Sequence, residues 1–442
     1  MTNGRRKLKN LVRCLMIKMG VWTFYKFIRE NTAIFKVIGC NLNYARQIKR
    51  LRLKQKDEKI RVLFIVSEIA KWKEQKLYEA MKQSGVFEPI VGLSDWNRQS
   101  ERFCNNDELL KIHKDAVAFF NRLGDEYVRT VEIRNGKRIH LDLSVFKPDI
   151  VFYTEQWTPC QKQDPYTVSK FALTFFTTYY VGEYFAPEWD CHQLVERLVY
   201  GYFCLNQELC NVYQKSIRFV CHTTKFFPTG HPGLDYFSKE TCENTGGDYV
   251  IYAPHFSFPN PNSPDYDEHL STFDWNGREI LAYAQAHPEM KWVFKPHPLL
   301  REWILDSGFM TDRELADYFA SWSHVGVVCE DGDYQHLFLK SRVMITDCGS
   351  FLTEYGATGN PVIHLISSGN RLKVFDTLRH VFETYYRVCT LEQMYKTFEQ
   401  VLERGIDLHY EKRMAALSNA NIQGGNASMN ILDTMRKIID LK

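Results

Sequence analysis

Short apolar runs alternate with amphipathic stretches along most of the chain, beginning at residue 60. The first two runs, at 60–66 and 87–93, flank a segment at 70–84 whose apolar positions recur with helical spacing. Runs that are apolar throughout, separated by amphipathic helices, are typical of a parallel sheet that is covered on both faces. This pattern therefore predicts a βαβ unit that opens a doubly wound α/β fold.

The same alternation predicts the elements of the first half of the chain. We expect strands at 149–153, 173–180 and 219–221, a hairpin at 131–143 around Asn135-Gly136, and helices at 107–123 and 191–212. Asn-Gly between two strand-like runs is a strong hairpin signal. A polar stretch with two adjacent glycines, at 239–248, then marks a break in the pattern.

A second α/β series follows this break. We expect its strands at 249–253, 292–294, 325–328, 343–346 and 361–366, with helices at 276–286, 312–322, 333–340 and 350–358. Helices at 391–404, 409–418 and 428–441 complete the chain. The predicted division is a basic arm at 1–58, two Rossmann-like domains at 59–243 and 244–410 that face a cleft, and C-terminal helices at 411–442.

Composition supports a multidomain globular protein. The chain has 442 residues, of which 45% are apolar and 25% charged, and this length exceeds one ordinary domain. Twelve cysteines are present without a CxxC pair, so reduced thiols in the cytoplasm are the simplest interpretation. No Asp-x-Asp motif stands at a predicted strand end, and we expect neither a protein-bound metal nor a cofactor.

Charge is distributed unevenly. Residues 1–56 hold fifteen Lys and Arg side chains and one acid, Glu30, whereas the remainder of the chain is net acidic. Aromatic residues, among them Trp22 and Phe35, lie between these cations. Such a helical arm suits the surface of an anionic membrane, with the alternative that it packs on the body of the protein. No nucleic-acid fold motif accompanies it, so we expect no nucleic-acid partner. No run of about 18 apolar residues predicts a membrane span.

Two polar strings follow strand-like runs of the second series. Lys295-Pro296-His297-Pro298 comes directly after 292–294, and residues 347–355 (DCGSFLTEY) come directly after 343–346. Ligands of open α/β sheets bind at the carboxyl ends of strands. A cation, an imidazole, a hydroxyl and a helix start at one edge suit a phosphate-rich ligand. The structural alternative is that Lys295 pairs with an acid, His297 stabilises a turn and Ser350 only caps a helix.

Several motifs in order resemble the CDP-glycerol glycerophosphotransferase family of teichoic-acid and capsule polymerases. They are Gly230-His231-Pro232-x-x-Asp235, Tyr252-Ala253-Pro254, the Lys295–Pro298 string, the segment 345–355 and Gly359-Asn360-Pro361-Val362. The resemblance covers roughly residues 145–370. It implies a GT-B-like fold, in which the C-terminal domain holds the nucleotide of a CDP-linked donor.

The resemblance also implies roles for individual residues. Lys295 and His297 match positions that contact the donor pyrophosphate, and Asp347 and Ser350 match the family's phosphate-binding Asp-Tyr-Ser-Ser turn, with Phe351 directly after it. Gly349 replaces the first Ser of that turn, so one hydroxyl is lost while the backbone N–H remains. Glu354 lies one helical turn further on, where many GT-B enzymes place an acid on the ribose; a solvated or capping Glu is the alternative.

The proton acceptor is less well defined. Classical members of the family carry a His-Gly-Thr motif at the end of a first-domain strand, and here the corresponding place, near Tyr179, has no His. Glu155 and Glu183 end predicted first-domain strands, and His255 follows the first strand of the second domain. These three, with His297, are the candidate catalytic residues. His231 lies in the turn Gly230-His231-Pro232 with Asp235 nearby, where a structural or hinge role competes with a chemical one.

The resemblance implies a transferase. It would move a glycerol-phosphate or related polyol-phosphate unit to a hydroxyl of a cell-surface glycan or lipid-linked acceptor and release CMP. We expect it at the cytoplasmic face of the cell membrane of a bacterium, docked through residues 1–56. The alternatives are a GT-B glycosyltransferase that uses a nucleotide sugar and a non-catalytic, membrane-docked module of polysaccharide assembly.

Overall fold

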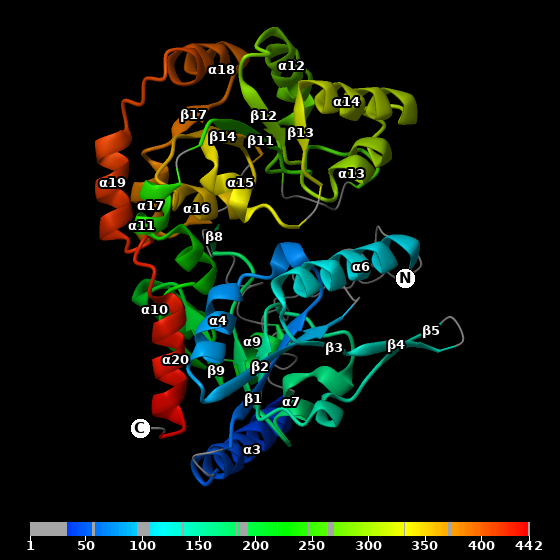
Figure 1. Ribbon diagram of the computed structural model, residues 1–442, viewed down its shortest axis with the longest axis vertical. Coiled ribbons are helices and arrows are strands. Elements are labelled where there is room, and N and C mark those ends of the chain that lie inside the picture. The colour runs from blue at the N-terminus through cyan, green and yellow to red at the C-terminus, as the bar shows by residue number, and fades with distance from the viewer. Residues whose placement is uncertain are drawn as a thin grey trace, which may run out of the picture.

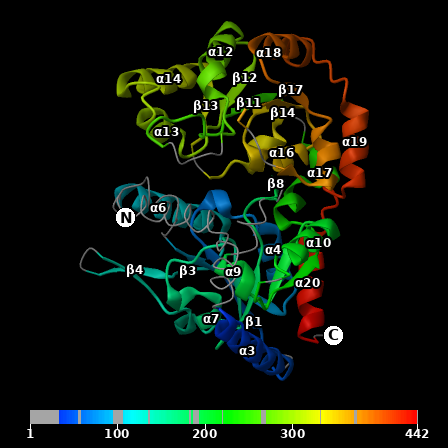
Figure 2. The ribbon, with the colours of Figure 1, turned by 180° about the vertical axis from the view of Figure 1, so that it is seen from behind.

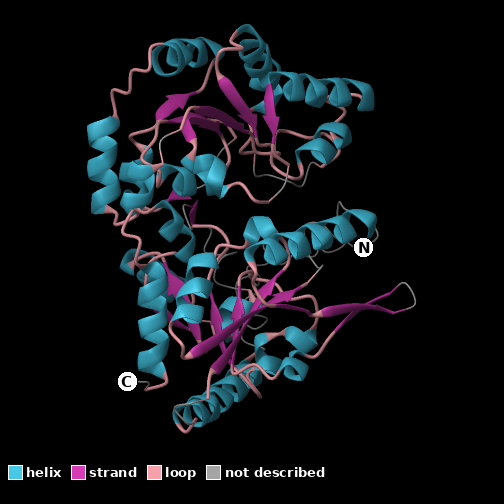
Figure 3. Ribbon diagram, in the orientation of Figure 1, coloured by secondary structure: helices cyan, strands magenta, loops and turns pink. Residues whose placement is uncertain are grey.

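The structure is a computed structural model of the whole chain. It describes residues 33–440 apart from 55–57, 95–105, 135–136, 182–183, 186–192, 219, 246, 264–268, 331 and 370–372. Two parallel sheets form two α/β layers, one above the other in the view of Figure 1, with helices on both faces of each sheet (Figure 3).

The first domain is built on a seven-stranded parallel sheet of order β10-β9-β7-β6-β1-β2-β3. Its strands are β1 (Ile60–Val66), β2 (Phe87–Leu93), β3 (Tyr127–Arg129), β6 (Ile150–Tyr153), β7 (Leu173–Phe176), β9 (Gly201–Cys204) and β10 (Lys225–Pro228). Its helices are α3 (Ile34–Arg52), η1 (Ile69–Lys71), α4 (Gln75–Gln83), α6 (Asn106–Leu123), α7 (Pro165–Val168), α9 (Leu194–Leu198), α10 (Gln207–Ser216) and η4 (Pro232–Phe237). The central strands β6, β7 and β9 are buried at every position, as expected for a sheet that is covered on both faces.

The second domain has a six-stranded parallel sheet of order β13-β12-β11-β14-β15-β17. Its strands are β11 (Tyr249–Ala253), β12 (Lys291–Phe294), β13 (Gly326–Val328), β14 (Ser341–Thr346), β15 (Val362–Leu365) and β17 (Tyr386–Val388). Its helices are α11 (Lys239–Asn244), α12 (Phe273–Ala286), α13 (Leu300–Asp306), α14 (Asp312–Val325), α15 (Gln335–Leu339), α16 (Gly349–Gly356), α17 (Asp376–Phe382), α18 (Leu391–Phe398) and a π-helical turn η5 (Glu399–Glu403). One face of this sheet carries an aromatic core, in which Phe294 stacks on Trp322 at 4.8 Å.

The two domains are joined by more than the chain between them. The short strands β8 (Tyr184–Phe185) and β16 (Lys373–Val374) pair antiparallel, one from each half of the sequence. After α19 (Tyr410–Asn419), helix α20 (Ala427–Ile438) returns to the first domain and lies beside α4 and η4 (Figure 2). Its residues Ile431, Leu432 and Met435 are part of the first-domain core.

Four predicted elements differ from the structure. The strand expected at 219–221 is not formed at residues 220 and 221, and the strand that follows α10 is β10, four residues further on. The helix expected at 70–84 is the turn η1 followed by α4, with residues 72–74 between them. The helix expected at 191–212 contains a buried strand, β9, between α9 and α10. The strand expected at 173–180 ends at Phe176. The predicted hairpin is present as β4 (Val131–Arg134) and β5 (Lys137–His140); its Asn135-Gly136 turn lies outside the described residues.

Candidate functional site

Three turns of the second domain lie side by side at the carboxyl edge of its sheet. Strand β11 pairs with β12 on one side and with β14 on the other, so the residues that follow these strands are neighbours although they are far apart in the sequence. This edge, which we call the donor edge, holds His255, Lys295, His297, Gly349 and Ser350.

His255 and His297 form a pair whose ring centroids are 4.8 Å apart. Each ring turns its Nδ1 atom toward the backbone of its own turn: His297 Nδ1 accepts from the Leu299 N–H at 3.1 Å, and His255 Nδ1 accepts from the Ser257 N–H at 3.3 Å. Both Nδ1 atoms are therefore acceptors, which leaves the proton of a neutral ring on Nε2. Each ring then has one Nε2–H that can donate to an anion.

The environment favours the neutral form of both rings. Burial lowers the pKa of His255 to about 3. Burial lowers the pKa of His297 well below its ordinary value, and repulsion from the positive charges of His255, Lys295 and Lys71 lowers it further. A bound diphosphate would act in the opposite direction, because an anion stabilises the imidazolium form.

Asp347 supports the His255 turn. Its Oδ1 accepts from the His255 N–H at 2.6 Å, and its Oδ2 accepts from the N–H and the Oγ1–H of Thr272, each at 2.6 Å. Burial raises the pKa of Asp347 to about 6, although these hydrogen bonds lower it. The structure thus places Asp347, expected among the donor-binding residues, where it ties the turn after β11 to the start of α12.

Helix α16 begins at the donor edge with Gly349. Its N-cap is Cys348, whose side chain makes no cap hydrogen bond to the backbone and contacts Ser350 Oγ at 3.4 Å. The first N–H groups of a helix favour an anion, so Gly349 and Ser350 stand where phosphate binding was predicted. Phe351 has a different environment, because its ring packs against Tyr334 and Phe338 at 5.1 Å each.

Glu354, one turn further along α16, is bound by the other domain. Lys73, in the turn before α4, donates to Glu354 Oε1 at 2.9 Å and to Oε2 at 3.0 Å. The Tyr334 hydroxyl donates to Oε2 at 2.8 Å, and Gln335 Nε2 donates to Oε1 at 3.2 Å. Both charged side chains are almost fully buried. In the structure Glu354 therefore joins the two domains. Its carboxylate, predicted to contact the ribose, binds Lys73, Tyr334 and Gln335 instead.

Across the cleft, the first domain contributes an acid–lysine cluster. Glu155, after β6, accepts from Lys71 Nζ at 2.9 Å and from the Ser67 hydroxyl, and Glu68 also contacts Lys71 Nζ, at 3.0 Å. Burial lowers the pKa of Lys71, but the carboxylates of Glu155 and Glu68 outweigh this and raise it above the ordinary value. Lys71 is thus a permanently charged cation, and its ammonium is close enough to His297 to lower that histidine's pKa. A small cavity of about 20 Å³ lies beside Glu155.

Both ring nitrogens of His231 form hydrogen bonds with the backbone. His231 Nε2 donates to the Thr178 carbonyl at 2.7 Å, and Nδ1 accepts from the Gly233 N–H at 3.1 Å. Burial lowers the pKa of His231 to about 4. Asp235 accepts from the N–H groups of Ala427 and Ser428, at the start of α20. These contacts favour the structural interpretation of the turn Gly230-His231-Pro232.

Two of the predicted features fall on residues that the structure does not describe. Glu183 is outside the described residues, as are residues 1–32 of the basic arm. Within the described ranges, no group of three His, Cys, Asp or Glu side chains is arranged to hold a metal ion. The described helices also include none whose length and hydropathy would let it cross a bilayer.

Sequence reasoning missed Lys71, Lys73 and Tyr334. The two lysines were assigned to the predicted helix at 70–84, although the cluster of polar residues directly after the strand 60–66 was a signal for a strand-end site. Two ammonium groups lie near the Tyr334 ring: Lys73 Nζ is 4.5 Å and Lys295 Nζ is 5.4 Å from its centroid. No local motif marks such a residue.

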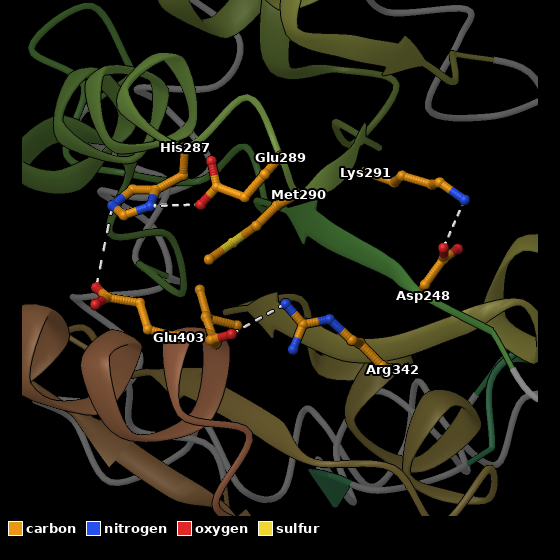
Figure 4. Close-up of a pocket in the computed structure, with 8 residues that line it drawn as sticks. Asp248, His287, Glu289, Met290, Lys291, Arg342 and Glu403 are labelled. Atoms are coloured by element: carbon orange, nitrogen blue, oxygen red, sulfur yellow. Dashed lines mark hydrogen bonds and ion pairs between the residues drawn. The ribbon is translucent and has the colours of Figure 1, made fainter.

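A further cavity, of about 350 Å³, lies at the opposite, amino edge of the second sheet (Figure 4). Most of its charged groups are paired: His287 contacts Glu289 at 2.9 Å and Lys291 contacts Asp248, while Arg342 donates to the Leu402 backbone carbonyl at 3.1 Å. Mixed, mutually paired charges do not suit a polyanion, and the cavity contains none of the predicted donor-binding residues.

Comparison with solved structures supports the two-domain architecture. The wall teichoic acid polymerase TagF, in one variant, aligns with a TM-score of 0.53 at 13% identity over 95% of this chain and 98% of that chain. A second TagF variant gives 0.50 at 12% identity over the same shares. A Listeria monocytogenes protein assigned as a UDP-N-acetylglucosamine 2-epimerase gives 0.51 at 14% identity over 87% and 98%.

The chain has a GT-B fold. Two Rossmann-like domains face each other, as the alternation of apolar runs and amphipathic segments predicted. At sequence identities of 12–14%, the comparison supports the fold alone. No protein-family profile and no curated protein sequence matches the chain.

Proposed function

We propose that this protein transfers a glycerol-phosphate, or related polyol-phosphate, unit from a CDP-linked donor to a hydroxyl of a cell-surface glycan or lipid-linked acceptor. One observation carries the proposal: Lys295, the His255–His297 pair and the uncapped start of α16 converge at one edge of the second sheet. This combination of a cation, Nε2–H donors and helix N–H groups suits a pyrophosphate. The TagF neighbours, which are named as teichoic acid polymerases, agree with it.

The proposed reaction needs little covalent work from the protein. The acceptor oxygen attacks the distal phosphorus of the CDP-polyol, a new P–O bond forms, and the bond from that phosphorus to the bridging oxygen breaks. The electron pair of the broken bond remains on CMP, and the acceptor proton passes to a base. Catalysis by positioning and charge stabilisation is typical of phosphoryl transfer. Lys295 and His297 are proposed to stabilise the charge on the departing CMP.

The proposed base is Glu155 or His255. Glu155 lies on the acceptor side of the cleft, where its contacts with Lys71 and Ser67 fix its orientation. His255 lies on the donor side and is the weaker candidate, because its pKa is lowered and its Nδ1 already accepts from the Ser257 N–H. Glu183 stays a sequence-based candidate. Replacing each residue in turn separates these roles, because loss of the base lowers kcat and leaves donor affinity unchanged.

A second candidate is a GT-B enzyme that acts on a nucleotide sugar. The neighbour from Listeria monocytogenes, assigned as a UDP-N-acetylglucosamine 2-epimerase, favours it. Purified protein should be incubated with CDP-glycerol, CMP-sugars and UDP-sugars in the presence of a glycan acceptor. Release of CMP from CDP-glycerol, lost in His297→Ala and Ser350→Ala, is the expected result. Turnover of a nucleotide sugar alone would overturn the phosphotransferase proposal.

We also propose that the enzyme works at the cytoplasmic face of the membrane, docked through its basic N-terminal region. The support is compositional: fifteen Lys and Arg against one acid in residues 1–56. A non-catalytic assembly module is the remaining alternative, motivated by the missing His near Tyr179. It would gain if polymer synthesis in cells survived both His297→Ala and Ser350→Ala.

A further inference from the structure

Helix α3 has two different faces. One face is buried and consists of Val37, Cys40, Tyr44, Gln47 and Leu51, which pack on α7, α9 and β7. The Tyr44 hydroxyl anchors this face by donating to the Leu198 carbonyl at 2.6 Å. The helix is therefore a fixed part of the first domain.

The opposite face begins with large apolar side chains in solvent. Phe35 is 82% exposed, Ile38 51% and Leu42 59%. Their spacing of three and four residues places them in one stripe along the helix. Exposed apolar residues are ordinary when scattered, but a contiguous stripe on one helix is typical of a surface that binds a partner.

The same face continues with cations. Arg46 and Lys49 lie further along it, both are exposed, and neither forms an ion pair with a residue of the described ranges. Other cations of the region do pair with the body, since Lys36 contacts Asp164 and Arg50 contacts Asp149. Helix α3 contains no Asp or Glu. The face is thus apolar in its first half and positively charged in its second.

We infer that this face of α3 is the surface that docks on an anionic phospholipid bilayer. The inference rests on the membrane part of the proposed function and names its contact residues. Phe35, Ile38 and Leu42 enter the headgroup region while Arg46 and Lys49 meet lipid phosphates. Charge argues for this partner over two others. A second copy that docks through the same face, or the basic residues 1–32, would bring cations against cations, whereas an anionic bilayer neutralises them.

The position of α3 also indicates how far from the membrane the acceptor hydroxyl reacts. The helix ends beside the amino edge of the first sheet, where Arg50 and Lys54 contact Asp149 just before β6, and it lies at the end of the molecule away from the second domain (Figures 1 and 2). The cleft is at the carboxyl edge. With β1 seven residues long, the two edges of the sheet are roughly 20 Å apart. The reacting hydroxyl is then at the free end of an extended lipid-linked chain, not at the level of the headgroups.

The test is vesicle co-sedimentation of the full-length protein. Vesicles of phosphatidylcholine with about one third phosphatidylglycerol are compared with phosphatidylcholine alone. We expect the triple variant Phe35→Ala, Ile38→Ala, Leu42→Ala to bind the anionic vesicles at least about tenfold more weakly than the wild type. The pair Arg46→Gln, Lys49→Gln should lose about tenfold at low salt and less at 0.5 M salt, because screening already weakens the wild type there.

The matched control is Ile406→Ala, Leu408→Ala, Tyr410→Ala, three exposed side chains of the second domain. This variant should bind vesicles like the wild type. Equal vesicle binding by the α3 triple variant and the wild type would overturn the inference, as would a dimer-to-monomer change in the triple variant without a change in vesicle binding. The α3 variants should keep turnover on a water-soluble acceptor. If no variant, including the wild type, turns over CDP-glycerol while α3-dependent vesicle binding persists, the proposed reaction fails and the docking surface stands.

Discussion

The two imidazoles of the donor edge are poised to respond to an anion. His255 and His297 are packed together, their Nδ1 atoms accept backbone N–H groups, and burial lowers the pKa of each. A diphosphate bound to their Nε2–H groups would raise the pKa of His297 toward neutrality. The complex would then hold more protons than the free protein, and by linkage its formation would be favoured at lower pH.

We therefore predict that the affinity for CDP-glycerol increases roughly five- to tenfold from pH 8 to pH 6. CDP-glycerol suits the test because its esterified phosphates do not titrate in this range. Calorimetry in two buffers of different ionisation enthalpy should detect proton uptake on binding. His297→Asn should bind more weakly and lose most of the pH dependence, while His287→Asn, at the amino edge of the same sheet, should keep it. Wild-type affinity that does not vary between pH 6 and 8 would contradict this role.

Glu74 is a buried acid whose contacts are entirely internal. It is 0% exposed, Oε1 accepts from the Thr177 hydroxyl at 2.6 Å, and Oε2 accepts from the Lys73 N–H at 2.9 Å. Burial raises the pKa of Glu74 from 4.5 to about 7, although these hydrogen bonds lower it. Because the folded protein holds this proton more tightly than the unfolded chain, the stability from Glu74 is full below pH 4.5 and decreases as the pH rises to about 7.

Glu74→Gln should remove this loss. The glutamine can accept from the Lys73 N–H and donate to Thr177 Oγ1, so it satisfies the same partners. Relative to the wild type, the variant should gain roughly 2.5 kcal/mol of unfolding free energy between pH 5 and pH 8. The difference between the two thermal midpoints across this range measures the gain. Glu79→Gln, on the outer part of α4, should give a flat difference, and a flat difference for Glu74→Gln would show that its carboxylate is stabilised as an anion.

At the scale of elements, helix α20 depends on a cap that comes from elsewhere in the chain. Its own N-cap, Asn426, makes no side-chain cap bond, and the Asp235 carboxylate instead accepts the N–H groups of Ala427 and Ser428 at 2.9 and 2.7 Å. Gly230 has φ +90°, and a Cβ there would lie 2.8 Å from Ala427 Cβ. The turn at 230–235 is therefore shaped to fit the start of α20.

Asp235→Ala should loosen this helix. Loss of a charged cap costs about 1–2 kcal/mol, and the cost should appear as faster amide hydrogen exchange in residues 427–439. The affinity for CDP-glycerol should not change, because the donor edge belongs to the other domain. Asp433→Ala, an exposed acid on the same helix, is the control and should exchange like the wild type. Equal exchange in both variants would mean that packing of Ile431 and Met435 alone holds α20.

The elements also show what sequence patterns could predict. Strands β1 and β2 have the predicted bounds, because each is a buried apolar run between polar turns. Strand β9 was missed because its four residues are buried on both faces and so show no period that separates a strand from a helix. Likewise, the donor edge followed from the strands that precede it, but the contact of Lys73 with Glu354 joins residues 281 positions apart. Such a pairing depends on how the domains close, which no local pattern contains.

At the scale of the whole molecule, Lys73 and Glu354 form a buried ion pair between the two domains. Both side chains are less than 5% exposed, and Tyr334 and Gln335 complete the hydrogen bonds of the carboxylate. Outside the cleft the domains are joined by the β8–β16 ribbon and by α20, which hold their outer side. Arg122 of the first domain also pairs with Asp333 of the second, but both of these side chains are partly exposed. The buried Lys73–Glu354 pair is therefore the ion pair whose loss should do more to open the cleft side.

Lys73→Met should open the molecule, because it leaves a buried carboxylate without its cation. Removal of one partner of a buried pair costs about 3–5 kcal/mol, whereas replacement of both partners by apolar side chains can be nearly neutral. We expect Lys73→Met to lower the thermal midpoint and raise the radius of gyration in solution scattering, and the double variant Lys73→Met, Glu354→Met to recover much of both. Lys76→Met, an exposed lysine of α4, is the control. A double variant as open and unstable as the single one would contradict this role of the ion pair. The effect of Lys73→Met would then come from the lost contact between Lys73 and the Tyr334 ring.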